Sequence, residues 1–172
     1  MTDLAAAKKH RLAPLTTPTP LGADATRDIS AELNALLADT FALYFKTKNF
    51  HWHVSGPHFR DYHLLLDDQA TQILGVTDAI AERVRKTGNT TLRSIGDISR
   101  RQSIKDNDRD FVPAAEMLAE LRDYTLKLVE RFREVKEAAE TAKDNATSGI
   151  VDEWTDQAEE RAWFLFEASR KA

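Results

Sequence analysis

Apolar residues recur every three or four positions over four long stretches of the chain, with charged residues between them. This is the periodicity of an amphipathic helix that turns one face toward a protein core. It predicts helices over about residues 24–54, over about 58–87, from Pro113 to beyond Val135, and over about 147–169. Four long amphipathic helices pack together as an all-α four-helix bundle.

The connections between these helices differ in length. Ser55-Gly56-Pro57 ends the first helix, because glycine closes helices and proline cannot continue one. A link of roughly 24 residues follows Gly88 and is long enough to cross the length of the bundle. About Leu92 to Arg101 is predicted to form a short helix within it. Residues 1–23 contain several helix breakers and are interpreted as a flexible, extended arm, before a bundle domain of residues 24–172.

The bulk composition limits the class of protein. The 172 residues suffice for one domain with a core, and only 6 Gly and 5 Pro favour helix throughout. The chain has no cysteine, so any metal must be held by oxygen and imidazole ligands. It has no long apolar stretch or signal-peptide core, so we expect a soluble, cytoplasmic protein with no membrane partner. A net charge of −4 does not attract nucleic acid, which would require a local basic patch.

Five residues of metal-binding type have a spacing that one helix cannot use alone: His51, His63, Asp67, Asp78 and Glu82. His63 and Asp67 are four residues apart, as are Asp78 and Glu82, so each pair shares a helix face. The pairs are separated by roughly 22 Å of helix, whereas two ligands of one metal lie within about 4 Å of each other. A single site that uses both pairs therefore requires a two-fold dimer, in which this helix packs antiparallel to its own copy.

The predicted second helix has two faces of buried character. The core stripe contains Phe59, Tyr62, Leu66, Ile73, Ile80 and Val84. The metal-binding pairs lie roughly 60–160° further round. Beside them stand small or apolar residues where a solvated face would carry charge: Ala70, Leu74 and Ala81. A second apolar face favours a partner copy. His, Asp and Glu with open positions suit Fe(II) and its oxidation, and they accept zinc as well.

Simpler interpretations of these residues remain open. A His–Asp or Asp–Glu pair four residues apart is usually part of a solvated helix face, and His51 can simply cap the end of the first helix. A di-iron site inside one bundle needs Glu-x-x-His motifs on two helices. None of the histidines has Glu three residues before it, so that type of site is absent.

The segment from Lys46 to Gly88 resembles the Dps family, the DNA-binding proteins from starved cells that are also called mini-ferritins. The family pattern is His-Trp, Gly, Phe, His-x-x-x-Asp and then Asp-x-x-x-Glu-Arg. The matching residues are His51-Trp52, Gly56, Phe59, His63, Asp67, Asp78 and Glu82-Arg83. The four-helix pattern extends the resemblance over about residues 24–169. It implies a ferritin-like four-helix bundle that assembles through two-fold dimers into a hollow homo-dodecamer.

The resemblance also implies an activity. Members of the family oxidise Fe(II), preferably with hydrogen peroxide, at two-fold interfaces and store ferric mineral in the shell, which protects DNA. By resemblance, His51, His63 and Asp67 come from one subunit, and Asp78 and Glu82 come from its mate. Reduction of peroxide to water by paired Fe(II) ions avoids hydroxyl radical.

Three further residues near the motif have weaker assignments. Trp52 matches a position where an indole can intercept stray oxidising equivalents, and a packed aromatic residue at a helix end is an equally good explanation. His53 stands where the family usually has Asn or Asp, and we interpret it as an interface or surface histidine. His58 is interpreted as a helix-start residue.

The resemblance implies that iron enters through acidic three-fold pores near the start of the last helix. Asp144 and Glu153 fit such a pore, but Gly149 occupies a position that is often Asp. The alternative is a solvated acidic helix start, which the helix dipole favours.

A short basic cluster in the arm consists of Lys8, Lys9 and Arg11, with His10 nearby and Asp3 offsetting it. Three charges on phosphate give weak, salt-dependent DNA binding, which the arms of a dodecamer would multiply through effective concentration. Packing of the arm on a neighbouring subunit is the alternative. Two functions therefore remain, an iron-storing ferroxidase and a nucleoid-compacting, non-specific DNA-binding protein with secondary metal sites.

Overall fold

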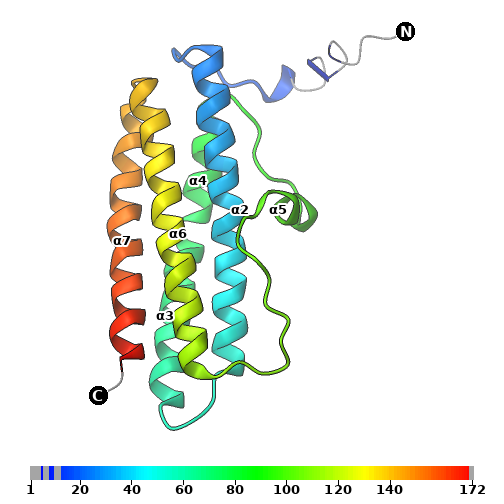
Figure 1. The fold of residues 1–172 in the computed structure, drawn as a ribbon. Coiled ribbons are helices and arrows are strands. Elements are labelled where there is room, and N and C mark those ends of the chain that lie inside the picture. Colours follow the sequence, from blue (N-terminus) through cyan, green and yellow to red (C-terminus); the bar gives the residue numbers. More distant parts are fainter. Residues whose placement is uncertain (1–4, 6–7, 10–12, 171–172) are drawn as a thin grey trace.

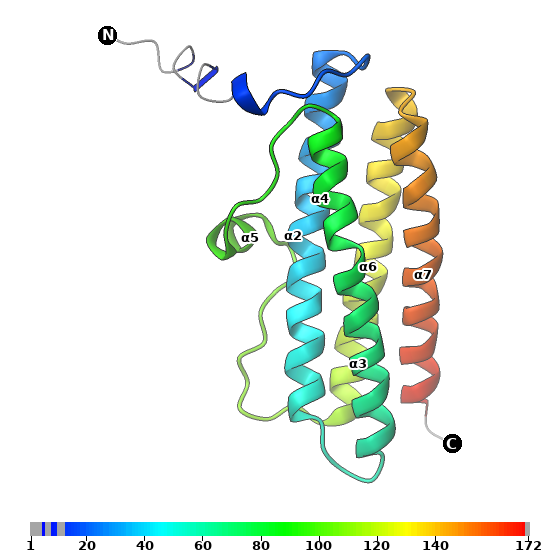
Figure 2. The ribbon, with the colours of Figure 1, turned by 180° about the vertical axis from the view of Figure 1, so that it is seen from behind.

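The computed structural model describes residue 5, residues 8–9 and residues 13–170. In these ranges the regular elements are all helical, and no helix is both long and apolar enough to cross a membrane. The elements are η1 (Ala13–Leu15), α2 (Ala23–His53), α3 (Phe59–Gly75), α4 (Thr77–Lys86), α5 (Ile95–Arg101), α6 (Ala114–Thr141) and α7 (Asn145–Ser169). Helices α2, α6, α7 and the column of α3 and α4 lie side by side (Figures 1 and 2). The prediction of an all-α four-helix bundle is confirmed.

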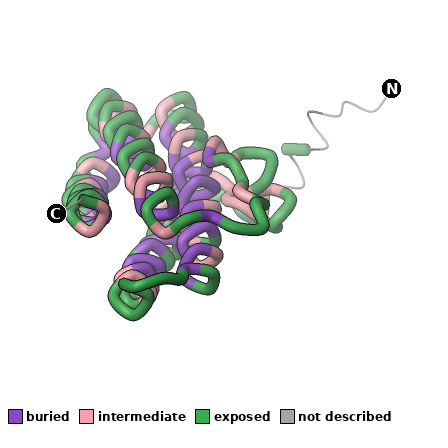
Figure 3. Tube along the Cα trace, turned by 60° about the horizontal axis from the view of Figure 1, so that its bottom comes forward, coloured by how far each residue is buried: buried purple, intermediate pink, exposed green. Residues whose placement is uncertain are grey.

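Side chains from all four columns form one core. Leu33 and Leu37 of α2, Ile80 of α4, Phe132 of α6 and Leu165 of α7 are each at most 1% exposed. The buried segments lie on the inward sides of the helices, and the outward sides are exposed (Figure 3). Full burial of one such side chain contributes roughly 1.5–3 kcal/mol of transfer free energy. The three- and four-residue spacing of apolar residues in the sequence therefore does mark the core.

The single second helix predicted over residues 58–87 is wrong in one respect, because it is interrupted at Val76. Gly75, which has a low helix propensity, precedes the interruption. The Thr77 hydroxyl donates a hydrogen bond to the Leu74 carbonyl (2.7 Å), so a side chain competes for a backbone acceptor there. The buried stripe continues on both sides of the interruption, which is why periodicity alone did not reveal it.

Local capping sets where the other helices begin. Helix α7 starts at Asn145, two residues earlier than predicted, because the Asp144 side chain caps its first turn. Pro113 is the N-cap residue of α6, with φ −59° and ψ 142°, and not a residue of the first turn. Helix α5 confirms the short helix in the long link, but it begins only after Ser94, whose hydroxyl caps it.

The long link crosses the bundle on the outside of α2, and α5 lies on the side of α2 that faces away from α7 (Figures 1 and 2). Asp39 of α2 is 2% exposed and accepts hydrogen bonds from the backbone N–H groups of Ser103 and Ile104. Lys46 of α2 is also buried and forms an ion pair with Glu120 of α6. Because buried polar groups require partners, the Asp39 contacts hold the link against α2, and the Lys46 pair holds α2 against α6.

Part of the predicted arm is attached to the bundle. Its η1 segment forms a 3-10 turn, and Arg85 of α4 donates a hydrogen bond to the Leu15 carbonyl (2.6 Å). Gly88 has φ +92°, and a Cβ atom there would lie 2.8 Å from the Thr17 carbonyl oxygen. Only glycine fits that conformation and that approach. The arm therefore leaves the bundle from a fixed contact at the end of α4.

Phe59, which periodicity assigned to the core stripe, lies at the surface instead, as do two aromatic residues of α2. Phe45 is 63% exposed, Trp52 56% and Phe59 46%. An apolar stripe drifts round a long helix, so residues near its ends leave the bundle core. Together they make an apolar surface near the junction of α2 and α3, of the kind that a partner chain covers.

Candidate metal centre

The end of α2 and the start of α3 place two histidine rings face to face. His51 lies in the last turn of α2, and His63 lies in the second turn of α3. Their ring centroids are 3.8 Å apart and their planes are inclined by 23°. His51 Nδ1 lies 2.8 Å from the backbone oxygen of His63, and His63 Nδ1 lies 2.9 Å from the backbone oxygen of His51. Each ring is thus held by the main chain of the other histidine.

These hydrogen bonds fix where the protons are. A carbonyl oxygen only accepts, so each imidazole donates through an Nδ1–H group, and a neutral ring keeps its lone pair at Nε2. Nε2 is therefore the atom of each ring that is available to a metal. Metal-binding histidines usually have their other ring nitrogen held in this way. His51 is only 7% exposed, so its ring has little freedom to turn.

Asp67 lies one helical turn after His63 and joins the pair. Its Oδ1 is 3.9 Å from His51 Nε2 and 2.7 Å from Lys48 Nζ. The Lys48 hydrogen bond is the main reason why the pKa of Asp67 lies below its ordinary value. Desolvation opposes this shift, while the charges of Lys48 and the two histidines add to it. We refer to His51, His63 and Asp67 as the α2–α3 group.

Lys48 belongs to this site, although the sequence analysis did not select it. Its side chain is 18% exposed, and its ammonium group occupies the carboxylate oxygen of Asp67 that lies nearest to His51. The available sequence signal was its place three residues before His51, on the same face of α2. A cation that binds the α2–α3 group must compete with Lys48 for Asp67.

The other two predicted ligands lie apart from the α2–α3 group. Asp78 and Glu82 are exposed on α4, and Glu82 accepts a hydrogen bond from Lys86 (2.9 Å). No hydrogen bond or ion pair within the described residues joins either carboxylate to the α2–α3 group. Nor do the described residues of one chain contain three His, Asp or Glu side chains arranged to hold a metal ion. A site with all five ligands requires a second chain.

Aromatic rings flank the α2–α3 group. The Phe59 ring centroid is 5.1 Å from that of His63. The Trp52 indole makes an edge contact with Phe45 at 6.0 Å, and the Lys48 ammonium lies 5.9 Å from the indole centroid. The indole therefore lies at the surface beside the residue that holds Asp67, and not in the bundle core.

The two neighbouring histidines do not join the group. His53 is exposed, and its Nδ1 is hydrogen-bonded to the Asn49 carbonyl of its own helix (2.7 Å). His58 is the N-cap residue of α3, with its ring 5.6 Å from that of Tyr62. These surroundings agree with a surface histidine and a helix-start residue.

Asp144 and Glu153, the two residues assigned to a pore, have different surroundings. Both carboxylate oxygens of Asp144 accept hydrogen bonds from Arg83 Nη2 (2.7 and 2.8 Å), and Thr147 donates to them as well. Burial raises the pKa of Asp144, but the hydrogen bonds from Arg83 and Thr147 outweigh it and hold this pKa below the ordinary value. Asp144 thus caps α7 in the single chain, and its assignment to a pore between subunits stays a prediction. Glu153 is exposed and accepts only a hydrogen bond from Gln157 (3.1 Å).

The basic cluster of the arm is only partly described. Lys8 and Lys9 are exposed, whereas His10 and Arg11 lie outside the described residues. Binding of DNA by this cluster therefore stays a prediction.

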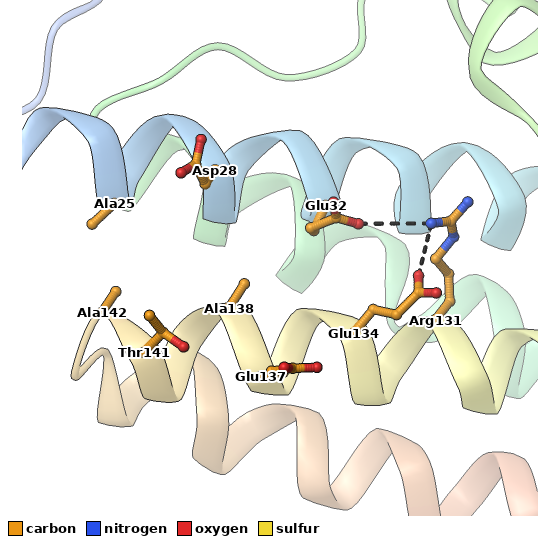
Figure 4. A pocket seen from close by; sticks show the side chains of 9 residues that line it. All are labelled: Ala25, Asp28, Glu32, Arg131, Glu134, Glu137, Ala138, Thr141 and Ala142. Carbon is orange, nitrogen blue, oxygen red and sulfur yellow. Dashed lines mark hydrogen bonds and ion pairs between the residues drawn. The ribbon is translucent and has the colours of Figure 1, made fainter.

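A surface hollow lies away from the α2–α3 group, between the start of α2 and the end of α6 (Figure 4). It has a volume of about 650 Å³ and is lined by the carboxylates of Asp28, Glu32, Glu134 and Glu137. Arg131 of α6 pairs with Glu32 of α2 (3.7 Å) and with Glu134 of its own helix (2.8 Å). No residue of the candidate metal centre lines this hollow.

Comparison with known proteins agrees with the fold and the motif. A family model described as a ferritin-like domain matches residues 30–171. The DNA protection during starvation protein of Halobacterium salinarum is 33% identical over 77% of this chain and 73% of its own. The protein of the same name from Agrobacterium fabrum is 30% identical over 87% of this chain and 92% of its own. The crystal structure of an archaeal Dps homologue from Halobacterium salinarum superposes with a TM-score of 0.84 at 30% identity, over 89% of this chain and 85% of that chain. The chain therefore belongs to the Dps family of ferritin-like proteins.

Proposed function

We propose that the protein is a ferroxidase that oxidises Fe(II), preferably with hydrogen peroxide, at sites shared between two subunits. The α2–α3 group is the observation that carries this proposal. It offers two imidazole Nε2 atoms and an ionised carboxylate where the end of α2 lies against the start of α3. Nitrogen and oxygen donors with open positions suit Fe(II). Membership of the Dps family supports iron chemistry in general.

Asp78 and Glu82 of a second subunit complete the site in this proposal. Residues 63 and 67 are as far from the midpoint of residues 72 and 73 as residues 82 and 78 are, so the ligand positions are symmetric about that midpoint. An antiparallel pair of these columns with its two-fold axis there brings each half-site to its complement, twice. Leu74, which is 41% exposed next to this midpoint, offers an apolar contact for the second copy.

The proposed reaction is 2 Fe²⁺ + H₂O₂ + 2 H⁺ → 2 Fe³⁺ + 2 H₂O. Each Fe(II) loses one electron, and the oxygen–oxygen bond of peroxide breaks to give two water molecules. Because both electrons are delivered together, no hydroxyl radical is released. Trp52 lies at the surface beside Lys48, where it can take up stray oxidising equivalents. The ferric product would be stored as mineral inside a hollow dodecamer, with Asp144 and Glu153 at the entry pore.

Complementation between two inactive subunits tests the shared site. One variant carries His63→Ala and Asp67→Ala, and the other carries Asp78→Ala and Glu82→Ala. Each alone should lose fast, peroxide-dependent oxidation of Fe(II), followed by ferric absorbance after anaerobic loading. When the two are unfolded and reassembled together in equal amounts, about one quarter of the sites regain all five ligands. Activity should therefore return to about a quarter of the wild-type rate.

The matched control is Asp61→Asn, an exposed carboxylate on α3 outside the group, which should keep wild-type oxidation. Full activity of either double variant alone would show that the ligand assignment is wrong. Inactivity of the mixed particles, with normal assembly, would show that the two pairs do not share a site.

A second candidate function is non-specific DNA binding through the arm. The exposed Lys8 and Lys9 favour it, together with relatives that are named for DNA protection. In that case the protein would lie in the cytoplasm, in association with the nucleoid. Deletion of residues 1–11 leaves the contact between Arg85 and Leu15 intact. The deletion should abolish retardation of DNA in gels at low salt and spare iron oxidation. Retained retardation would show that the arm is not the DNA-binding element.

A further inference from the structure

Helix α4 carries two of the five candidate iron ligands, Asp78 and Glu82, and it is a separate helix from α3. Because the column is interrupted at Val76, no continuous helix sets the rotation of α4 about its own axis. The buried side chains of Ile80 and Val84 pack α4 into the core, but apolar packing is not directional. A directional contact is needed to hold the two carboxylates in one orientation.

Arg83 of α4 makes such a contact. Its Nε atom donates a hydrogen bond to the Thr147 hydroxyl (2.7 Å), and its Nη2 atom donates to both carboxylate oxygens of Asp144 (2.7 and 2.8 Å). These two acceptors form the capped start of α7, where Asp144 is 4% exposed and Thr147 is 0% exposed. Within the described part of the chain, no other side chain of α4 has a hydrogen bond or ion pair to α2, α6 or α7. Arg83 therefore fixes α4 against α7.

The place of Arg83 on its helix suits this role. At about 100° per residue, it lies about 100° round α4 from Glu82, between the ligand face and the face that packs in the core. A rotation of α4 by roughly 20° would move a group at the helix surface, roughly 5–6 Å from the axis, by about 2 Å. Metal–ligand distances tolerate only about 0.2 Å. A small rotation that the Arg83 contacts prevent would thus displace both carboxylates from a metal.

We propose that Arg83 is a positioning residue for the half-site of Asp78 and Glu82. It ties α4 to the start of α7 and so fixes where the two carboxylates meet His63 and Asp67 of a second subunit. This inference rests on the proposed ferroxidase site, and it predicts the sign of an effect. The positive charge of Arg83 by itself disfavours a metal cation beside it, so loss of the charge alone would tighten metal binding. Loss of positioning weakens binding instead.

Anaerobic titration of the iron-free particle with Co(II) tests the proposal. Arg83→Met and Arg83→Lys should each bind Co(II) about tenfold more weakly than the wild type, with an altered absorption spectrum. Lysine keeps the charge but cannot make the forked contact, so it should not restore binding. The control is Leu121→Ala, which truncates a buried side chain in α6 and destabilises the fold without changing α4. This variant should keep the Co(II) affinity of the wild type.

Asp144→Asn tests the same contact from the side of α7. It removes the charge that Arg83 meets, so it should also weaken Co(II) binding. Combined with Arg83→Met it should add little, because the two residues act through one contact. Unchanged or tighter Co(II) binding in both Arg83 variants, with normal assembly, would overturn the proposal. So would an equal loss in Leu121→Ala, since general destabilisation would then explain the effect.

The double variant Asp78→Ala and Glu82→Ala separates this proposal from the shared site on which it rests. It should lose the Co(II) binding of the wild type. If it binds Co(II) as the wild type does, the shared site is wrong and the role of Arg83 falls with it. If it loses Co(II) while both Arg83 variants keep it, only the positioning role is wrong.

Discussion

Single side chains decide what the candidate metal centre can bind. Mutual backbone hydrogen bonds hold His51 and His63 with their Nε2 lone pairs free, and Lys48 holds Asp67 ionised. A metal cation therefore meets two imidazole Nε2 atoms and a carboxylate, but it must displace one ammonium group from that carboxylate. The motif revealed the three donors from the sequence. Lys48 could not be recognised in that way, because its pairing with Asp67 depends on how α2 lies against α3.

Replacement of Lys48 by methionine tests this competition, because it removes the ammonium and keeps most of the apolar side chain. We expect Co(II), a spectroscopic substitute for Fe(II), to bind about two- to fivefold more tightly, the scale of a partly exposed charge pair. Anaerobic absorbance titration measures the affinity. Lys105→Met, on the outer link, should change nothing. Weaker Co(II) binding in Lys48→Met would mean that the ammonium organises the site and does not compete for it.

The pair of Arg83 and Asp144 has a pH dependence that follows from its position. Arg83→Met leaves a buried carboxylate without its cation, which costs about 3–5 kcal/mol. The folded-state pKa of Asp144 lies below the ordinary value of 3.8. The pair therefore stabilises the fold fully above that value and loses this effect as pH falls through the folded-state pKa.

Thermal midpoints measured from pH 7 downward check that expectation. In Arg83→Met the desolvated Asp144 has lost its cation, which raises its pKa. The gap to wild type should therefore begin to shrink as pH falls through that raised value, and it should close below the wild-type pKa of Asp144. Arg100→Met, which removes a largely exposed pair with Asp97, should show little gap at any pH. A gap that stays constant from pH 7 down to about pH 3 would assign the effect to another group.

At the scale of elements, periodicity and helix breakers predicted most of the fold. The four stretches of apolar periodicity predicted the four helical columns. Gly and Pro residues predicted where helices end to within a few residues. Two features were missed for physical reasons. The interruption at Val76 leaves the buried stripe intact, so it has no signature in hydrophobicity. The capping role of Asp144 depends on Arg83 from another helix, which no local pattern contains.

Two glycine-to-alanine substitutions separate the effect of helix propensity from the effect of a backbone conformation that only glycine adopts easily. A Cβ atom at Gly75 meets nothing within 4 Å, so Gly75→Ala should stabilise the column by about 0.5–1 kcal/mol through helix propensity. At Gly88 the backbone has φ +92° and a Cβ atom would lie 2.8 Å from the Thr17 oxygen. Gly88→Ala should therefore destabilise the fold by about 1–3 kcal/mol. Urea unfolding of the two variants side by side measures both, and equal effects would contradict the structure.

As a whole molecule, the single chain leaves much aromatic surface uncovered. The most exposed examples are Phe45, Trp52, Phe111, Trp163 and Phe166, each at least 46% exposed. They are spread over α2, the long link and α7, so one contact with one partner cannot cover them all. This distribution agrees with contacts to more than one copy, as the proposed dodecamer would provide.

Substitution of Leu74 by arginine tests whether assembly and chemistry depend on each other. A charge at the proposed two-fold contact should prevent close packing of the columns and give smaller species by light scattering. Peroxide-dependent iron oxidation should then fall to the background rate, while the helical circular dichroism persists. Leu126→Arg places the same charge on a similarly exposed leucine of α6. Because Leu126 is not part of the proposed two-fold contact, this variant should keep both that contact and iron oxidation. Dissociated subunits that still oxidise Fe(II) rapidly would show that one chain suffices.

The anchoring of the arm at Leu15 has a consequence for distance. Lys8 lies seven positions before this anchor, and a fully extended chain spans at most about 3.6 Å per residue. The Lys8 backbone therefore cannot lie more than about 25 Å from the Arg85 contact. DNA bound by Lys8 and its basic neighbours would therefore lie within about 25 Å of the Arg85 contact. Each arm could bind DNA only close to the surface of its own subunit. Neighbouring particles could share a DNA strand only when their surfaces almost touch.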